Sequence, residues 1–204
     1  EALALLRRPE ARAEEAREWT DLVLGMALDA GRRAAAERIL RDRLAREPLS
    51  LDARSHLSRV LLDGGRSQAA RRLWLEAFAR PELVQGKGIL TLAERARRAG
   101  FPALARERLA AVHAAGEGEL ALWCGLELAE LLAKAGRPGR STALLRELAD
   151  KAREHPSLLR AVGERLEYAG FPREAAACYE AVLARRRGHD LELRLAWLQA
   201  GIGR

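Results

Sequence analysis

The side chains whose types could hold a metal or act as nucleophiles are four histidines and two cysteines. The histidines are His56, His113, His155 and His189. None of them belongs to a His-Glu-x-x-His motif, which places two zinc ligands on one helix face, and His155-Pro156 and Gly188-His189 are typical of loops. Cys124 and Cys178 lie far apart in the sequence, so we expect small buried side chains rather than a disulfide or a nucleophile. We therefore predict no metal and no cofactor.

Phosphate-binding and hydrolase motifs are also missing. The sequence has no Gly-x-x-x-x-Gly-Lys loop and no Gly-x-Ser-x-Gly turn. The run Gly86-Lys87-Gly88 follows no strand pattern, so we interpret it as a linker between helices rather than a phosphate loop. These absences favour a protein without catalytic activity.

The charge of the chain leaves two classes of partner open. The 204 residues carry 36 Lys and Arg against 29 Asp and Glu, a net charge of +7, which could attract phosphates. Both signs are mixed along the chain, however, and this is more typical of solvated helix faces. The preference for Arg over Lys suggests a bacterial genome. No run of 18 apolar residues or targeting sequence is present, so we expect the bacterial cytoplasm or periplasm, without membrane insertion in this segment.

The elements that must position any site are indicated by five glycines that recur at intervals of 34 to 36 residues. They are Gly31, Gly65, Gly100, Gly136 and Gly170. Apolar residues at spacings of three and four precede each glycine, as in an amphipathic helix. Glycine supplies the left-handed conformation that ends a helix, and Pro102 and Pro172 suit the first turn of the next one. The period therefore predicts a repeated helix-turn-helix hairpin.

Three further positions keep their register with the turn glycine. Five residues after it stand small side chains, which let two helices approach: Ala36, Ala70, Ala105, Ser141 and Ala175. Nine residues after it stand Leu40, Trp74, Leu109, Leu145 and Tyr179, which are large. Eight residues before it stand Val23, Leu57, Leu92, Leu128 and Val162. We expect these positions, with Trp74 and Trp197, to pack between the helices.

This pattern resembles the tetratricopeptide repeat (TPR) family, most closely in the run from Ala169 to Leu183, with Gly163 and Pro48 at further family positions. The first-helix Gly of the family is mostly replaced, by Leu24, Ser58, Ala93 and Ala129. The resemblance implies an all-α, right-handed α-solenoid of antiparallel helix-turn-helix hairpins. It predicts one array over residues 1–204, cut from a longer one: a helix end at 1–8, repeats at about 17–50, 51–85, 86–121, 122–155 and 156–186, and a partial repeat at 187–204 that reaches its turn at Gly201.

In that family the first helices line a concave groove, and the matching places here are mostly charged. The candidate partner-binding residues are Arg59, Asp63, Glu94, Arg97, Arg98, Trp123, Glu130, Lys134, Arg160, Glu164 and Tyr168. The sequence has no Asn, which argues against the family's Lys-and-Asn grip on a terminal carboxylate. The arginines could bind carboxylates in another geometry, or they could pair with Glu94 and Glu130 and bind nothing specific. Trp123 and Tyr168 could each be an exposed hot spot or a packed side chain.

The resemblance implies a non-catalytic scaffold that binds a partner protein of unknown identity. It also suggests that the scaffold belongs to a bacterial secretion or exopolysaccharide-export assembly. The alternative is a helical-repeat protein that binds RNA through its basic surface. The absence of Asn and the irregular groove residues argue against a base code, though not against nonspecific phosphate binding.

Overall fold

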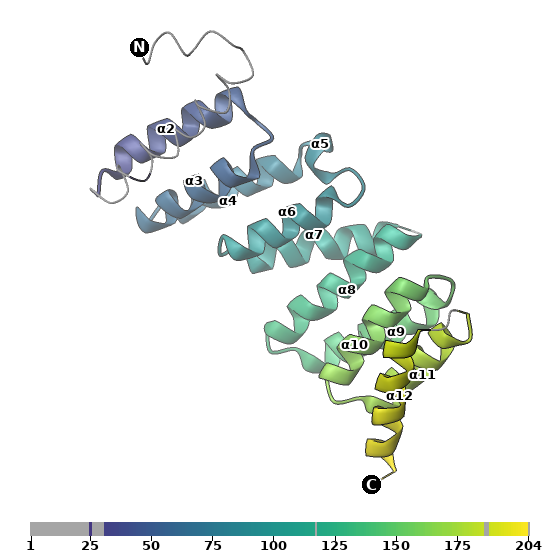
Figure 1. Cartoon of the computed structure of the whole chain (residues 1–204). Coiled ribbons are helices and arrows are strands. Elements are labelled where there is room, and N and C mark those ends of the chain that lie inside the picture. The colour runs from purple at the N-terminus through teal and green to yellow at the C-terminus, as the bar shows by residue number, and fades with distance from the viewer. Residues whose placement is uncertain (1–24, 26–30, 117, 186–187, 204) are drawn as a thin grey trace, which may run out of the picture. The chain divides into compact units, whose positions relative to one another are not determined.

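Every regular element in the part of the chain that the structure describes is a helix, as the glycine period predicts. The computed structural model describes residue 25 and residues 31–116, 118–185 and 188–203. The chain divides into two units, residues 1–83 and residues 84–204 (Figure 1). The helix end predicted at 1–8 and the positions Val23 and Leu24 lie outside the described residues.

In the first unit, three helices pack in chain order. They are α2 (Arg33–Arg46), α3 (Leu51–Asp63) and α4 (Ser67–Phe78). Here α3 and α4 form one hairpin, and α2 occupies the place of the second helix of the repeat before it. The short helix α5 (Pro81–Val84), which the sequence pattern does not predict, follows α4 and precedes the turn at Gly86.

In the second unit, consecutive helices also pack as hairpins, and α8 contacts α10 in addition. The helices are α6 (Gly88–Arg98), α7 (Pro102–Ala115), α8 (Glu119–Lys134), α9 (Pro138–Lys151), α10 (Pro156–Tyr168), α11 (Pro172–Leu183) and α12 (His189–Ile202), with a 3₁₀ turn at Ala152–Glu154 after α9. The all-α array of sequential hairpins is confirmed. The right-handed superhelix and the single array over residues 1–204 stay predictions.

The turn glycines adopt the conformation that their spacing predicts. All five have positive φ, between 66° and 91°. At Gly170 the next amide, of Phe171, donates to the carbonyl of Leu166 at 2.9 Å, and the residues after Gly65, Gly100 and Gly136 make the same bond. This six-to-one bond is the Schellman motif, which satisfies the free carbonyls at a helix end. Glycine is needed there because other residues are strained at positive φ.

The three positions in register with the glycine form the core. The small and large side chains in the second helices are all buried, and so are Leu57, Leu92, Leu128 and Val162 in the first helices. Trp74 is completely buried, which confirms its predicted packing role. The register of the array therefore follows from side-chain size at three fixed distances from each turn.

The two helices of a hairpin cross at the same place in the two units, but different residue pairs fill the contact. In the first unit, the buried Trp74 indole donates through Nε1 to the Oγ of Ser58 at 3.0 Å. In the second unit, a Cβ added to Gly163 would lie 2.6 Å from Cε1 of Tyr179. Each large residue therefore depends on a small partner seven residues before the turn glycine, and Tyr179 needs that partner to be glycine.

A buried arginine holds the first unit together where α3 and α4 meet. Arg54 is 3% exposed. It donates through Nη1 to the carbonyl of Leu73 at 2.9 Å and through Nη2 to that of Pro48 at 2.8 Å. A buried charge is tolerated only when it is hydrogen-bonded in this way. Arg54 thus serves the fold rather than a partner.

Three sequence expectations at the C-terminal end are wrong. His189 is the first residue of α12 rather than a loop residue. Gly201 lies inside α12, which continues to Ile202, so the helix does not turn there. Trp197 is 71% exposed instead of packed, because the buried side chains of α12 are Leu191 and Leu198.

Candidate partner-binding face

The predicted groove residues lie on α3, α6, α8 and α10, which are the first helices of their hairpins. We call the residues two, three, six and ten positions before each turn glycine, together with the side chains of α12 that pair with them, the first-helix face. On α3, Arg59 and Asp63 are exposed, and neither makes an ion pair with another residue that the structure describes. On the other three helices the face is densely paired.

On α6, both predicted arginines bind the same carboxylate. Arg97 donates to the two oxygens of Glu94 through Nε and Nη2, each at 2.6 Å, and Arg98 donates through Nε at 2.6 Å. The bonds from Arg97, and then those from Arg98, bring the pKa of Glu94 down to about 2 in spite of its partial burial. The two guanidinium groups are therefore held along their own helix by a fully ionised carboxylate.

On α8, Glu130 joins two helices. It accepts bonds from Lys134, one turn further along, and pairs with Arg165 of α10 at 2.5 Å. Burial, followed by the nearby Glu130 charge, raises the pKa of its neighbour Glu127. Arg165 lies 4.0 Å from Glu127 as well, so one arginine partly compensates two carboxylates. No sequence pattern indicated Arg165, since it stands outside the groove register.

Between α10 and α12, ion pairs link two facing stripes of side chains. Arg160 pairs with Glu164 at 3.1 Å and with Asp190 of α12 at 2.9 Å. Arg194 of α12 returns to α10, where it bonds Glu167 at 2.8 Å and approaches Glu164 at 3.5 Å.

The Tyr179 hydroxyl of α11 also donates to Glu167, at 2.8 Å, and Arg194 lies 5.7 Å from the centre of the Tyr179 ring. Burial and the bond to Glu167 raise the pKa of this phenol well above its usual range. A core residue, Tyr179, thereby fixes the position of Glu167 and of the arginine that crosses from α12.

These pairs set the register of α12 against α10 and place two exposed aromatic residues at one end. Asp190, Arg194 and Trp197 follow one another at spacings of four and three on α12, and Arg160, Glu164 and Tyr168 follow one another at spacings of four on α10. Arg194 meets residues 164 and 167, and Trp197 follows these contacts on α12 as Tyr168 follows them on α10. Tyr168 is 94% exposed and Trp197 is 71% exposed.

Trp123, the third aromatic candidate, lies in a different environment. It is partly buried against the core of the second unit, and its Nε1 donates to Glu119 at 3.0 Å. Its ring therefore offers less free surface than those of Tyr168 and Trp197.

The cysteine and histidine side chains that could act as nucleophiles or bind a metal do not come together in the described part of the chain. Cys124 and Cys178 are free and buried, as predicted, and burial raises the pKa of each thiol to about 11. His113 lies between helices with Nδ1 2.9 Å from the carbonyl of Ala121. Among the described residues, no three His, Cys, Asp or Glu side chains form a metal-binding group, and no helix is long and apolar enough to cross a bilayer.

No protein-family model matches the sequence, and no curated protein matches it. Several solved structures are similar to the chain. A thermophilic TPR protein of Thermus thermophilus is 20% identical, with a TM-score of 0.44, and the match covers 90% of this chain and 98% of that one. PilF of Pseudomonas aeruginosa is 17% identical, with a TM-score of 0.41 and coverages of 92% and 86%. A MamA structure, MSR-1 C2, is 17% identical, with a TM-score of 0.40 and coverages of 88% and 98%. The chain is similar to these proteins along about nine tenths of its length, while its hairpin-repeat fold is established by its own helices and turns.

Proposed function

We propose that this chain is a non-catalytic scaffold that binds another protein through the first-helix face. The observation that carries the proposal is the pair of exposed aromatic side chains, Tyr168 and Trp197, at the end of two facing stripes of charge. Large aromatic residues beside arginines are the side chains that most often dominate protein interfaces.

The charged part of the face supports a protein rather than a nucleic acid as the ligand. Arg97, Arg98, Arg165 and Arg194 already bind carboxylates of the chain. A phosphate backbone would have to compete with these bonds, and the neighbouring carboxylates would repel it. A protein can instead bury the aromatic side chains and add bonds at the rim of the paired network.

The extent of the interface also belongs to this proposal. We place the aromatic anchor at Tyr168 and Trp197 and the polar rim along Arg160, Glu164 and Lys134, with Glu94 of α6 as a further contact. Arg59 and Asp63 of the first unit stay partner contacts predicted from the family resemblance. The role in a secretion or exopolysaccharide-export assembly stays a prediction from the family resemblance.

The test is affinity capture from bacterial lysate, with and without nuclease, followed by titration of the captured protein in purified form. The double variant Tyr168→Ala/Trp197→Ala should weaken binding about tenfold or more, because hot-spot truncations remove more than about 1 kcal/mol each. Reversal of Arg97 and Arg98 to Glu should weaken it less, since Glu94 already engages both. Leu49→Ala, which removes another exposed apolar side chain from the first unit, is the matched control and should bind as the wild type does.

Equal binding by the double variant and the wild type would remove the aromatic pair from the interface. Capture of nucleic acid alone, weakening steeply as salt rises, would favour RNA binding instead.

A further inference from the structure

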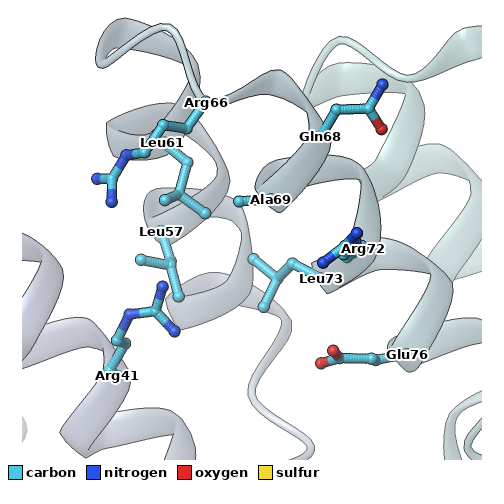
Figure 2. Close-up of a pocket in the computed structure, with 9 residues that line it drawn as sticks. All are labelled: Arg41, Leu57, Leu61, Arg66, Gln68, Ala69, Arg72, Leu73 and Glu76. Atoms are coloured by element: carbon cyan, nitrogen blue, oxygen red, sulfur yellow. The ribbon is translucent and has the colours of Figure 1, made fainter.

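A pocket of about 460 Å³ opens in the first unit between α2, α3 and α4. Figure 2 shows Arg41 of α2 on one side, Leu57 and Leu61 of α3 in the middle, and Arg72 and Leu73 of α4 on the other side. Arg66, Gln68, Ala69 and Glu76 complete the lining. The floor of the pocket is therefore aliphatic, with Leu57 and Leu61 almost fully buried, and its rim carries three arginines and one carboxylate, Glu76.

This pocket has an equivalent in the second unit, and the comparison shows which charged residues differ at the two rims. A pocket of the same volume lies between α9, α10 and α11, again two second helices and the first helix between them. Arg146 lines it ten residues after its turn glycine, as Arg41 does in the first unit. The two pockets therefore come from the same place in the repeat.

In the second unit, the neighbouring hairpin supplies the binding partners of Arg146. It donates to Glu174 at 2.8 Å and lies 5.2 Å from the centre of the Phe171 ring. In the first unit, Ala69 stands in place of Glu174 and Arg66 in place of Phe171. These two differences remove one carboxylate and add one positive charge, so three arginines and one carboxylate line this pocket where two of each line the other.

The remaining carboxylates in the first unit do not balance the rim. Arg41 and Arg66 both pair with Glu37 of α2, so one acidic group serves two arginines. Arg72 is exposed and makes no ion pair with any residue that the structure describes. Residues 31–83 hold twelve arginines against seven acidic residues, whereas the whole unit, residues 1–83, holds 16 arginines against 14 acidic residues, so the excess of positive charge is local to the part around the pocket.

We infer that this pocket, which we call the second-helix pocket, binds an acidic, amphipathic segment of a partner protein. One or two apolar side chains of that segment pack against Ala69 and Leu73, which are the partly exposed apolar residues of the lining, and flanking Asp or Glu side chains bind Arg72 and Arg41. Arginine binds carboxylates through two parallel hydrogen bonds, and the volume lies in the range of pockets that hold small organic groups.

The lining favours a peptide over single-stranded nucleic acid. Proteins that bind single strands stack the bases on aromatic side chains. The nine residues around this pocket include no Phe, Tyr or Trp. Aliphatic side chains beside arginines suit a Leu or Phe next to a carboxylate.

This site goes beyond the proposed function, since it uses other residues than the first-helix face and two of its three helices, α2 and α4, lie outside that face. The test is selection of a phage-displayed random peptide library on the whole chain, followed by fluorescence anisotropy with the enriched peptides. Arg72→Glu reverses the charge at the rim, and Arg71→Glu, next to it on α4 and also exposed, is the matched control outside the lining. Ala69→Met fills the pocket without changing the charge.

Enriched peptides should combine Asp or Glu with Leu or Phe. Arg72→Glu should weaken their binding by about tenfold or more, while Arg71→Glu should change it much less, because only the former loses a direct charge pair. Ala69→Met should also weaken binding, and Tyr168→Ala/Trp197→Ala should leave it unchanged.

The inference is overturned if the enriched peptides lack acidic residues or bind the Arg72→Glu and Ala69→Met variants as well as the wild type. Equal losses of peptide affinity in Arg71→Glu and Arg72→Glu would overturn the inference as well, because they would show that the peptides respond to overall charge and not to a specific site. Fluorescein-labelled oligouridylate, titrated in parallel, should not bind; binding that depends on Arg72 would assign the pocket to nucleic acid instead.

Discussion

The two units are built from the same hairpin but use their arginines differently. Residues 84–204 hold 20 Lys and Arg against 15 acidic residues, and many of these arginines join neighbouring first helices through carboxylates. Residues 1–83 hold 16 arginines against 14 acidic residues, and Arg59, Arg71 and Arg72 pair with none of the described residues.

This difference shows that the hairpin does not fix the chemistry of its surface. The core needs only the turn glycine and three positions of defined size, so the other positions are free to vary. In the second unit many of them link helix to helix, and in the first unit Arg59, Arg71 and Arg72 pair with none of the described residues. One fold can therefore carry two surfaces of different character.

The largest expected effect tests whether the units are separate in stability. Trp74→Ala should lower the free energy of unfolding of the first unit by about 3–5 kcal/mol, because it empties a fully buried site and leaves the Ser58 hydroxyl without its partner. Urea denaturation followed by circular dichroism measures the loss, and amide hydrogen exchange locates it. Exchange should accelerate in residues 31–83. Equal acceleration in residues 84–204 would mean that the two units unfold as one.

An intermediate effect tests the contact between Gly163 and Tyr179, which fills the helix crossing in the second unit. Gly163→Ala should destabilise the second unit by about 1–3 kcal/mol, since the new methyl group would press on the Tyr179 ring and on Cys178. Gly139→Ala is the control: a Cβ there meets nothing within 4 Å, so this helix should keep its stability or gain slightly. Thermal denaturation compares the two variants. Similar melting temperatures for both would show that the helices of this hairpin can move apart.

The smallest effect concerns the ion pairs of the second unit. The pKa of Glu94 in the folded chain is about 2, below the ordinary value of 4.5, so its ionised form stabilises the fold above the unfolded pKa, and this contribution is lost as the pH falls toward 2. Glu94 is partly exposed, so we expect Glu94→Gln to cost only about 0.5–1 kcal/mol at neutral pH. Urea unfolding of wild type and variant over a series of pH values should show that difference shrinking below about pH 4.5. A difference that stays constant down to the lowest pH would show that the cost has another cause than charge.

Much of the fold is predictable from the sequence because it is local. The turn at Gly170 depends on one residue that tolerates positive φ, and Pro172 then starts the next helix. The contact of Gly163 with Tyr179 lies within a single hairpin and follows from side-chain size at a fixed spacing. The hairpin turns could therefore be anticipated from the sequence, whereas α5 and the end of α12 could not.

The candidate site is predictable only in part. The register with the TPR family selected Arg97, Arg98, Glu130 and Tyr168, and they lie on the first helices as expected, but which of them contact a partner stays a prediction. It missed Arg165 and Arg194, since their partners lie on another helix about thirty residues away. It also placed Trp197 in the core, because the sequence suggested a turn at Gly201 that the helix passes through.

By itself, then, the sequence determined an all-α chain of glycine-terminated hairpins with a core of small and large side chains in fixed register, because each of these features arises within one repeat. Only the tertiary structure decided which arginines form ion pairs with carboxylates, which aromatic rings stay exposed, and that Arg41, Arg66 and Arg72 line one pocket. Those properties depend on the distances between helices of neighbouring repeats, and the spacing of residues along the chain does not contain them.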